Sequence, residues 1–176
     1  MQYRRSNTKG GTYFFTVNLA NRSQTLLVDN YHLLKEAIRI VKQRHPFHID
    51  AMVVLPDHLH TIWTLPVDDA DFSKRWGLIK SGFSRKLPKN ELRSKSRQSK
   101  AERGIWQRRF WEHQIRNQQD YNQHIDYIHY NPVKHGYVSK PSNWPQSSIH
   151  KFIQNAVINN DWGANEQPVF NSAIVE

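Results

Sequence analysis

The sequence predicts an α+β fold of the ferredoxin-like, split βαβ type. We expect an antiparallel sheet of four to five strands with helices on one face, followed by a C-terminal helical tail. Two observations support this fold. Segments with the two-residue period of a strand and segments with the 3.6-residue period of a helix follow one another as strand, helix, strand, strand, helix, strand, helix. Only the turn signal Pro56-Asp57 separates the second strand from the third, so these two form a hairpin.

The first half of the chain supplies three strands and one long helix. Its strand segments are rich in β-branched and aromatic residues, and its helical segment carries apolar side chains about one turn apart. The predicted strands span residues 12–19, 47–55 and 58–65, and the predicted helix spans residues 31–44.

The second half supplies two long helices, one strand and a short helix. A polar, charged segment that supports no core element lies between the first of these helices and the strand, and we expect it to be a mobile loop. Asn117 is a candidate cap for the second long helix, and Pro132 is expected to stop it. The predicted segments are a helix at 71–87, the loop at 88–103, a strand within 106–115, a helix at 118–130 and a short helix near 147–157.

The length of 176 residues suits one domain, which we place at residues 1–158 with a loosely ordered tail at 159–176. Cysteine is absent, so disulfides and thiolate metal sites are excluded. No apolar run reaches the length of a membrane span, and the first residues lack the apolar core of a signal peptide. We therefore expect a cytoplasmic protein that is associated with the nucleoid and not with a membrane.

The charge favours a polyanionic partner. Lys and Arg number 25 against 15 Asp and Glu, which gives a net charge of +10. Thirteen of the 25 basic residues fall between Lys74 and Arg109, and the aromatic residues Trp106, Phe110 and Trp111 lie before and after Arg108 and Arg109. Exposed rings among basic groups are typical of single-strand nucleic-acid binding, although at least two of these three rings are expected in the core.

The sequence His58-Leu59-His60 lies at the start of the third predicted strand. Because side chains alternate along a strand, both imidazoles project from one face while Leu59 points to the other. Two imidazoles in this arrangement can bind one divalent ion. With ten histidines in the chain the pattern is weak by itself, and two exposed histidines at a hairpin are the simpler interpretation.

The helix predicted at 118–130 carries a polar stripe. Tyr127 and Asn131 are four residues apart, and His124 is three residues before Tyr127, so a helix that reaches Asn131 would place all three on one face. A phenol, an amide and an imidazole together have the capacity for chemistry. The alternative is a tyrosine that only packs its ring and hydrogen-bonds through its hydroxyl.

Five segments together resemble the REP-associated tyrosine transposases, relatives of the single-stranded-DNA transposases that have one tyrosine and an HUH motif, in which U is a hydrophobic residue. The resemblance covers residues 3–162. The segments are GGTYFFTVNL, VVLPDHLHTIWTLP, WGLIKSGFSR, GIWQRRFWEHQIR and DYIHYNPVKHG.

The resemblance implies that Tyr127 is the catalytic nucleophile and that His58, His60 and Asn131 bind Mg²⁺ or Mn²⁺. Insertion-sequence relatives have Gln at the position of Asn131, so the shorter amide departs from their pattern. The implied activity is that of a metal-dependent endonuclease and transesterase. It would cleave and rejoin single-stranded DNA at hairpin-forming repetitive extragenic palindromes through a 5′-phosphotyrosine.

The charge pattern adds candidate DNA-binding residues, and one tyrosine per chain fits a monomer or a homodimer. The candidates are Arg4, Arg5, Lys80, Arg108 and Arg109.

Three alternatives remain at this point. A relaxase or rolling-circle initiator would use the same chemistry, but such proteins are usually longer. A non-catalytic regulator could keep the fold and bind hairpin DNA without cleaving it. A structural zinc protein could use histidines alone, although the absence of cysteine makes that uncommon; its ligands would be His58, His60, His124 and His129.

Overall fold

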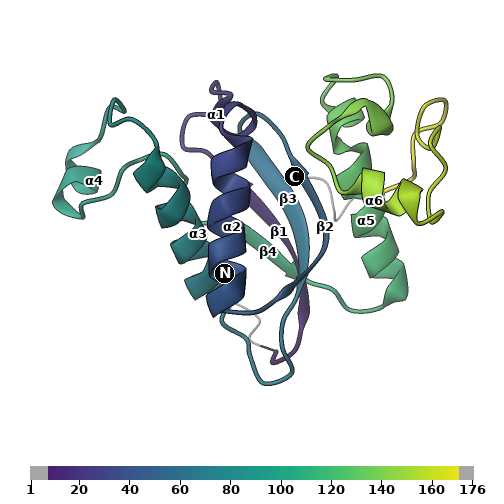
Figure 1. The fold of residues 1–176 in the computed structure, drawn as a ribbon, viewed down its shortest axis with the longest axis horizontal. Helices are drawn as coiled ribbons and strands as arrows, with labels where there is room; N and C mark the ends of the chain where they lie inside the picture. The colour runs from purple at the N-terminus through teal and green to yellow at the C-terminus, as the bar shows by residue number, and fades with distance from the viewer. Residues whose placement is uncertain (1–7, 171–176) are drawn as a thin grey trace.

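The computed structural model describes residues 8–170, in which four antiparallel strands form one open sheet (Figure 1). The order across the sheet is β2-β3-β1-β4, so the first strand lies inside the sheet beside the third. This is the predicted split βαβ arrangement. The strands are β1 Thr12–Asn18, β2 His48–Val54, β3 His58–Thr64 and β4 Trp111–Gln114.

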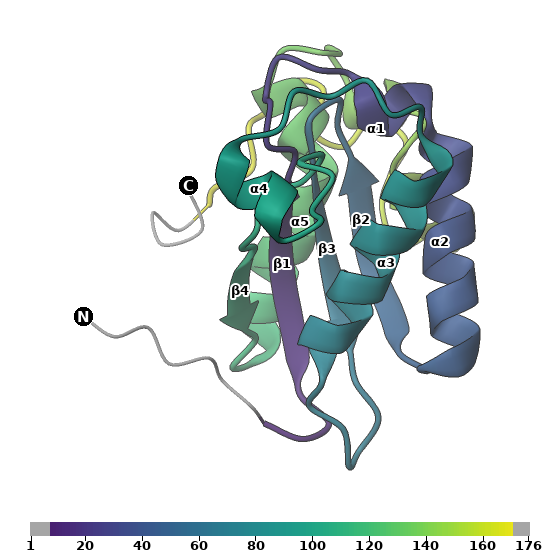
Figure 2. The same cartoon turned by 90° about the vertical axis from the view of Figure 1, so that its left-hand side faces the viewer.

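Two helices cover one face of the sheet (Figure 2). They are α2 Tyr31–Arg44, which connects β1 to β2, and α3 Phe72–Lys86, which connects β3 to β4. The alternate β1 side chains Tyr13, Phe15 and Val17 are buried beneath them. The prediction of one helix-covered face is confirmed for these two helices.

The third long helix, α5 Gln118–Lys134, lies on the opposite face (Figure 1). The sequence pattern predicts all helices on one face, and the structure differs because the second face is also apolar. Phe14 and Ile62 project from it and are buried together with Ile125 and Ile128 of α5. A sheet with two apolar faces needs a layer on each side.

The two ends of α5 differ in how well the sequence predicts them. Asn117 is the cap, as expected, since its side chain accepts a hydrogen bond from Asp120 N at 2.9 Å. Pro132 does not stop the helix, which continues to Lys134. The proline has no N–H to offer the carbonyl of Ile128, but only two residues of the helix follow it, and its own carbonyl accepts from Tyr137 N at 2.9 Å.

The charged segment 88–103 contains one short helix, α4 Lys95–Ser99, and is anchored at its ends (Figure 1). The Arg103 guanidinium forms an ion pair with Glu91 and donates to the carbonyl of Pro88 at 2.7 Å. Its hydrogen bond lowers the pKa of Glu91 to about 2. The segment predicted as a mobile loop is therefore held near the end of α3.

The segment after α5 packs beside β2. Ser148 Oγ accepts from Met52 N at 2.9 Å, and Trp144 Nε1 donates to the Val54 carbonyl at 2.9 Å. Among the helices of the described residues, none combines the length and apolar composition needed to cross a bilayer. The short elements are α1 Leu26–Asp29, η1 Pro141–Asn143 and α6 Ile149–Gln154.

Candidate active site

The histidine pair lies at the start of β3, on the face that α5 covers. In the strand register His58 pairs with Asn18 and His60 pairs with Thr16, while Leu59 is buried on the α2–α3 side. The two imidazole ring centroids are 4.9 Å apart. The predicted alternation is confirmed: both imidazoles face the same layer.

His60 is buried and has one ring nitrogen engaged. Its Nδ1 lies 2.9 Å from Thr16 Oγ1 on the neighbouring strand. Its Nε2 has no hydrogen-bond partner among the described residues. Burial lowers the pKa of His60 well below its ordinary value, and the positive charges of nearby basic groups lower it further. The imidazole is therefore neutral at pH 7, as a metal ligand must be.

His58 is oriented by the residue before it. Burial raises the pKa of the Asp57 carboxyl, but hydrogen bonds from His58 and Arg22 outweigh burial and lower it. The ionised carboxylate can only accept, so His58 Nδ1 donates to Asp57 Oδ1 at 2.7 Å. This leaves the lone pair of the imidazole on Nε2. A carboxylate that fixes the tautomer in this way is common at metal-binding histidines.

Tyr127 of α5 lies against the histidine pair. Its ring centroid is 5.2 Å from that of His60 and 6.0 Å from that of Phe14. The side chain is only 1% exposed, and Phe170 packs against it at 5.6 Å. Lys134 Nζ donates to the tyrosine hydroxyl at 3.1 Å. The structure thus buries the phenol but places it beside the histidines.

Asn131 lies one turn after Tyr127 and is fully buried. Within the described residues neither Oδ1 nor Nδ2 of its amide has a hydrogen-bond partner. Buried amides without partners are costly, and a bound ion is one way to satisfy them. Two imidazole nitrogens and an amide oxygen, the donor types of His58, His60 and Asn131, suit a divalent cation.

Several residues of this site escaped the sequence analysis. Asp57 and Thr16 hold the two histidines, while Lys134 contacts the tyrosine hydroxyl. The ring of His135 lies 5.1 Å from that of His58. Asp57 directly precedes the histidine pair, and Lys134-His135 belongs to the quoted segment DYIHYNPVKHG. Their positions next to recognised motifs could therefore have marked these three residues as part of the site. Thr16 is visible only once the strand register is known.

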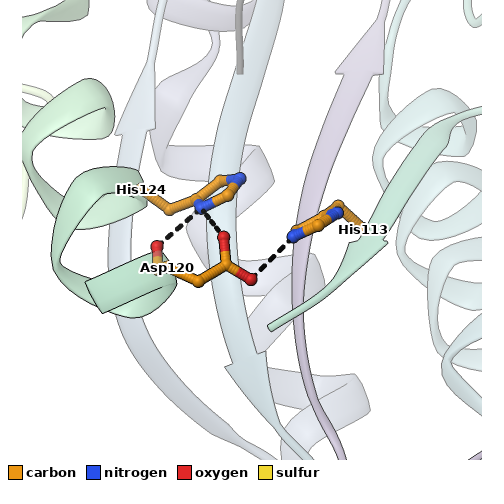
Figure 3. Close-up of side chains that lie close together, drawn as sticks. All are labelled: His113, Asp120 and His124. Carbon is orange, nitrogen blue, oxygen red and sulfur yellow. Dashed lines mark hydrogen bonds and ion pairs between the residues drawn. The ribbon is translucent and has the colours of Figure 1, made fainter. Parts of the chain in front are cut away.

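A second cluster of histidines lies at the start of α5. Figure 3 shows Asp120 between His113 of β4 and His124. Asp120 Oδ2 is 2.9 Å from His113 Nε2, and Asp120 Oδ1 is 3.1 Å from His124 Nδ1. One donor atom from each residue lies within 4.8 Å of the others, so the group is compact enough to hold a divalent ion.

The predicted DNA-binding residues lie away from the histidine pair or outside the described residues. Arg4 and Arg5 belong to the latter group. Lys80 of α3 donates to the Gln107 carbonyl at 3.0 Å, on the opposite side of the sheet. Arg108 forms an ion pair with Glu102 at 2.8 Å, whereas Arg109 is exposed.

A basic groove lies between α3 and the segment 101–108. The cavity has a volume of about 600 Å³. Two of the predicted residues, Lys80 and Arg108, line it. The other cationic residues along its walls are Arg85, Arg97 and Arg103.

Comparisons with known proteins agree with this geometry. Residues 8–131 match the family model described as "Transposase IS200 like". A REP-associated tyrosine transposase of Escherichia coli (strain K12) is 48% identical over 161 residues, which cover 92% of this chain and 90% of that protein. A solved structure of a REP-associated tyrosine transposase bound to a REP hairpin superposes with a TM-score of 0.82. It is 46% identical and covers 98% of this chain and 96% of its own.

The family match covers more than half of the chain, and the relatives extend over nearly all of it. The resemblance seen in the sequence is therefore confirmed, and so is the enzyme class. The chain belongs to the IS200-like transposases and, within them, to the REP-associated tyrosine transposases.

Proposed function

We propose that this enzyme binds hairpins of repetitive extragenic palindromes in single-stranded DNA. It cleaves the strand beside the hairpin, and can rejoin it, through Tyr127. His58, His60 and Asn131 hold Mg²⁺ or Mn²⁺ at the same site. It acts on the chromosome as a monomer or a homodimer.

One observation supports the site above all others: the predicted nucleophile packs against a predicted metal ligand. Tyr127 and His60 are 67 residues apart in the sequence, and their rings are 5.2 Å apart in the structure. Both His60 Nε2 and the Asn131 amide are buried without a partner among the described residues. These unsatisfied groups are expected where an ion binds.

In the proposed reaction Tyr127 Oη attacks the phosphorus of a phosphodiester. The phenol releases its proton to solvent, the bond from phosphorus to the 3′ oxygen breaks, and that oxygen takes up a proton, which leaves a 5′-phosphotyrosine and a free 3′-hydroxyl. One phosphodiester replaces another, so a 3′-hydroxyl can attack the phosphotyrosine in turn and restore the strand.

The chain's own groups prepare this attack. Lys134 Nζ, 3.1 Å from the phenol oxygen, stabilises the negative charge that grows there as the proton leaves. Asp57 and Thr16 keep the two imidazoles in place. When bound, a divalent ion supplies Lewis-acid polarisation of a non-bridging phosphate oxygen. Two imidazoles and an amide suit Mn²⁺ somewhat better than Mg²⁺.

The basic groove provides a surface for the hairpin stem. Lys80, Arg108 and their cationic neighbours line it, and Arg109 is exposed close by. Phosphate contacts of this kind position a nucleic acid without reading its sequence. Arg4 and Arg5 are proposed as an additional basic arm.

The test uses labelled hairpin oligonucleotides with single-stranded flanks, taken from intergenic repeats of the source genome, together with Mn²⁺. The wild-type protein should form a covalent DNA adduct that survives denaturant. Tyr127→Phe should lower adduct formation by on the order of 10³-fold or more, because the attacking oxygen is gone, and should leave hairpin binding nearly unchanged.

Tyr121→Phe is the matched control. Tyr121 is on the same helix, but its hydroxyl donates to Asp50 at 3.2 Å and does not face the histidines. Its variant should retain adduct formation. A full yield of adduct from Tyr127→Phe would assign the attack to another residue, and tight binding without any adduct from wild type would identify a hairpin-binding regulator.

A further inference from the structure

The three aromatic residues of the basic segment have different environments. Trp106 packs against Phe83 in the core, and Phe110 contacts Phe15 on the α2–α3 side of the sheet. Trp111 is 38% exposed. The expectation that at least two of these rings belong to the core is met, and one large aromatic surface remains open.

The strand register places Trp111 on the face of the active site. Thr16 of β1 pairs with His60 on one side and with Trp111 on the other, so these three residues form one row across the sheet. Residues in one row project from the same face. Trp111 therefore lies two strands away from His60, on the edge strand β4.

A single ring, Phe14, connects Trp111 to the reacting groups. The Phe14 ring centroid is 5.7 Å from that of Trp111, 5.5 Å from that of His60 and 6.0 Å from that of Tyr127. A group resting on Trp111 would thus be close to the phosphodiester that Tyr127 attacks.

The Trp111 indole packs against the second histidine cluster, which consists of His113, Asp120 and His124. The rings of Trp111 and His113 are nearly parallel, at 6°, with centroids 5.9 Å apart. His113 in turn stacks on the buried ring of His124 at 4.8 Å and 13°. Asp120 hydrogen-bonds both imidazoles and fixes their planes (Figure 3). A ring held in this way loses little conformational freedom when a ligand stacks on it.

We propose that Trp111 is a stacking site for an unpaired nucleobase in the single-stranded flank of the hairpin, next to the cleaved phosphodiester. Every base offers a π face to an indole, but only an unpaired base has that face accessible. Arg109 and Arg116, which precede and follow Trp111 in the sequence, are exposed, and their charge favours a phosphate backbone along this edge. His113, Asp120 and His124 are positioning residues for this ring. The proposal rests on the proposed function.

The test compares two DNA probes with three variants. One probe is a hairpin with a single-stranded 5′ flank that carries the fluorescent base 2-aminopurine; the other is the same hairpin with a blunt end. Trp111→Ala should weaken binding of the flanked hairpin by about fivefold or more, because each stacked base contributes about that factor, and should leave the blunt hairpin unchanged. Trp111→Phe should retain most of the affinity and most of the 2-aminopurine quenching.

Leu78→Ala is the control. Leu78 is also 38% exposed, but it lies on α3, on the opposite side of the sheet. This variant should bind both probes as wild type does. Thermal unfolding of each variant, read by circular dichroism, checks that the fold is intact.

Equal binding of the flanked hairpin by wild type and Trp111→Ala would overturn the proposal. So would an equal loss for both probes, which would indicate a contact with the stem, or a change in oligomeric state, which would indicate contact with a second copy. Failure of the proposed function has a different signature. In that case wild type forms no adduct with Mn²⁺, whatever Trp111 does to flank binding.

Discussion

Two histidine clusters lie on the same face of this sheet, and they differ in how their nitrogen atoms are used. At the start of β3, His58 donates to Asp57, and His60 has a buried Nε2 without a hydrogen-bond partner among the described residues. At the start of α5, His113 and His124 both face the carboxylate of Asp120. Histidine side chains thus have different partners in the two clusters.

The protonation of the second cluster follows from its geometry. His124 Nδ1 is 2.8 Å from the carbonyl oxygen of Asp120, which can only accept, so Nδ1 carries a proton. Hydrogen bonds from His113 and from the backbone of Arg116 outweigh burial and lower the pKa of Asp120. The ionised carboxylate then accepts a proton from His113 Nε2 as well.

The comparison teaches that a short distance between ligand-type atoms does not by itself make a metal site. The His113 and His124 nitrogens that contact Asp120 are donors, so a cation bound between these three residues would have to displace their protons. His58 donates to Asp57 through Nδ1 and keeps a lone pair on its other nitrogen, Nε2. We therefore propose the HUH pair as the place for the ion, and the cluster of His113, Asp120 and His124 as the support for Trp111.

The largest expected effect separates the two clusters by activity. Loss of a metal ligand in His60→Ala should reduce Mn²⁺-dependent cleavage by on the order of 10³-fold. His113→Ala, the matched change in the other cluster, should keep cleavage within about threefold on an excess of DNA, because it removes no ligand. Single-turnover cleavage of a labelled hairpin measures both. The opposite ranking would place the catalytic ion at His113.

A smaller expected effect distinguishes the two histidine clusters by the increase in Tm that bound Mn²⁺ causes, without any measurement of cleavage. Mn²⁺ at about 100 times its Kd stabilises a folded protein by about 2.7 kcal/mol, which raises the Tm of a chain of this size by roughly 5–10 °C. We expect this increase for wild type and for Asp120→Asn, and its absence in His60→Ala. Differential scanning calorimetry with and without a chelator provides the measurement. Loss of the increase in Asp120→Asn would contradict the assignment.

The smallest effect concerns stability. Asp120→Asn should lower the free energy of unfolding by about 1–3 kcal/mol at pH 7, because two imidazole donors lose a charged acceptor. The folded-state pKa of Asp120 is lowered, so its contribution is complete above the unfolded value of about 3.9 and is lost as the pH falls through the folded value. Urea unfolding at pH 7 and near pH 3 should show the difference between wild type and variant shrink. A constant difference would mean that charge is not its cause.

Local patterns predicted much of this molecule. Alternation along β3 placed both histidines on one face, and the helical period placed Tyr127 and Asn131 on one stripe. Asn117 was recognised as a cap by its residue type. Each of these features depends on neighbours within about one turn or one pleat, which the sequence displays directly.

Features that depend on distant partners were not predicted. Thr16 lies beside His60 because of the strand register, which the sequence does not display. Which of the nearby aromatic rings are buried, and that Trp111 stays exposed, depends on how the whole core packs. The placement of α5 on the second face depends on the apolar residues of three different strands. The prediction that Pro132 stops the helix was wrong, because the effect of a proline on a helix depends on its position and α5 continues for two further residues.

The passage of α5 through Pro132 has a mechanical consequence. Lys134 follows Tyr127 by seven residues, two full turns, so the phenol, the Asn131 amide and the Lys134 ammonium sit on one continuous rod. Any tilt or rotation of this helix moves the phenol, the amide and the ammonium together relative to the histidines of β3. The distance that changes during such a motion is the one between helix and strand, while the tyrosine keeps its ammonium partner throughout.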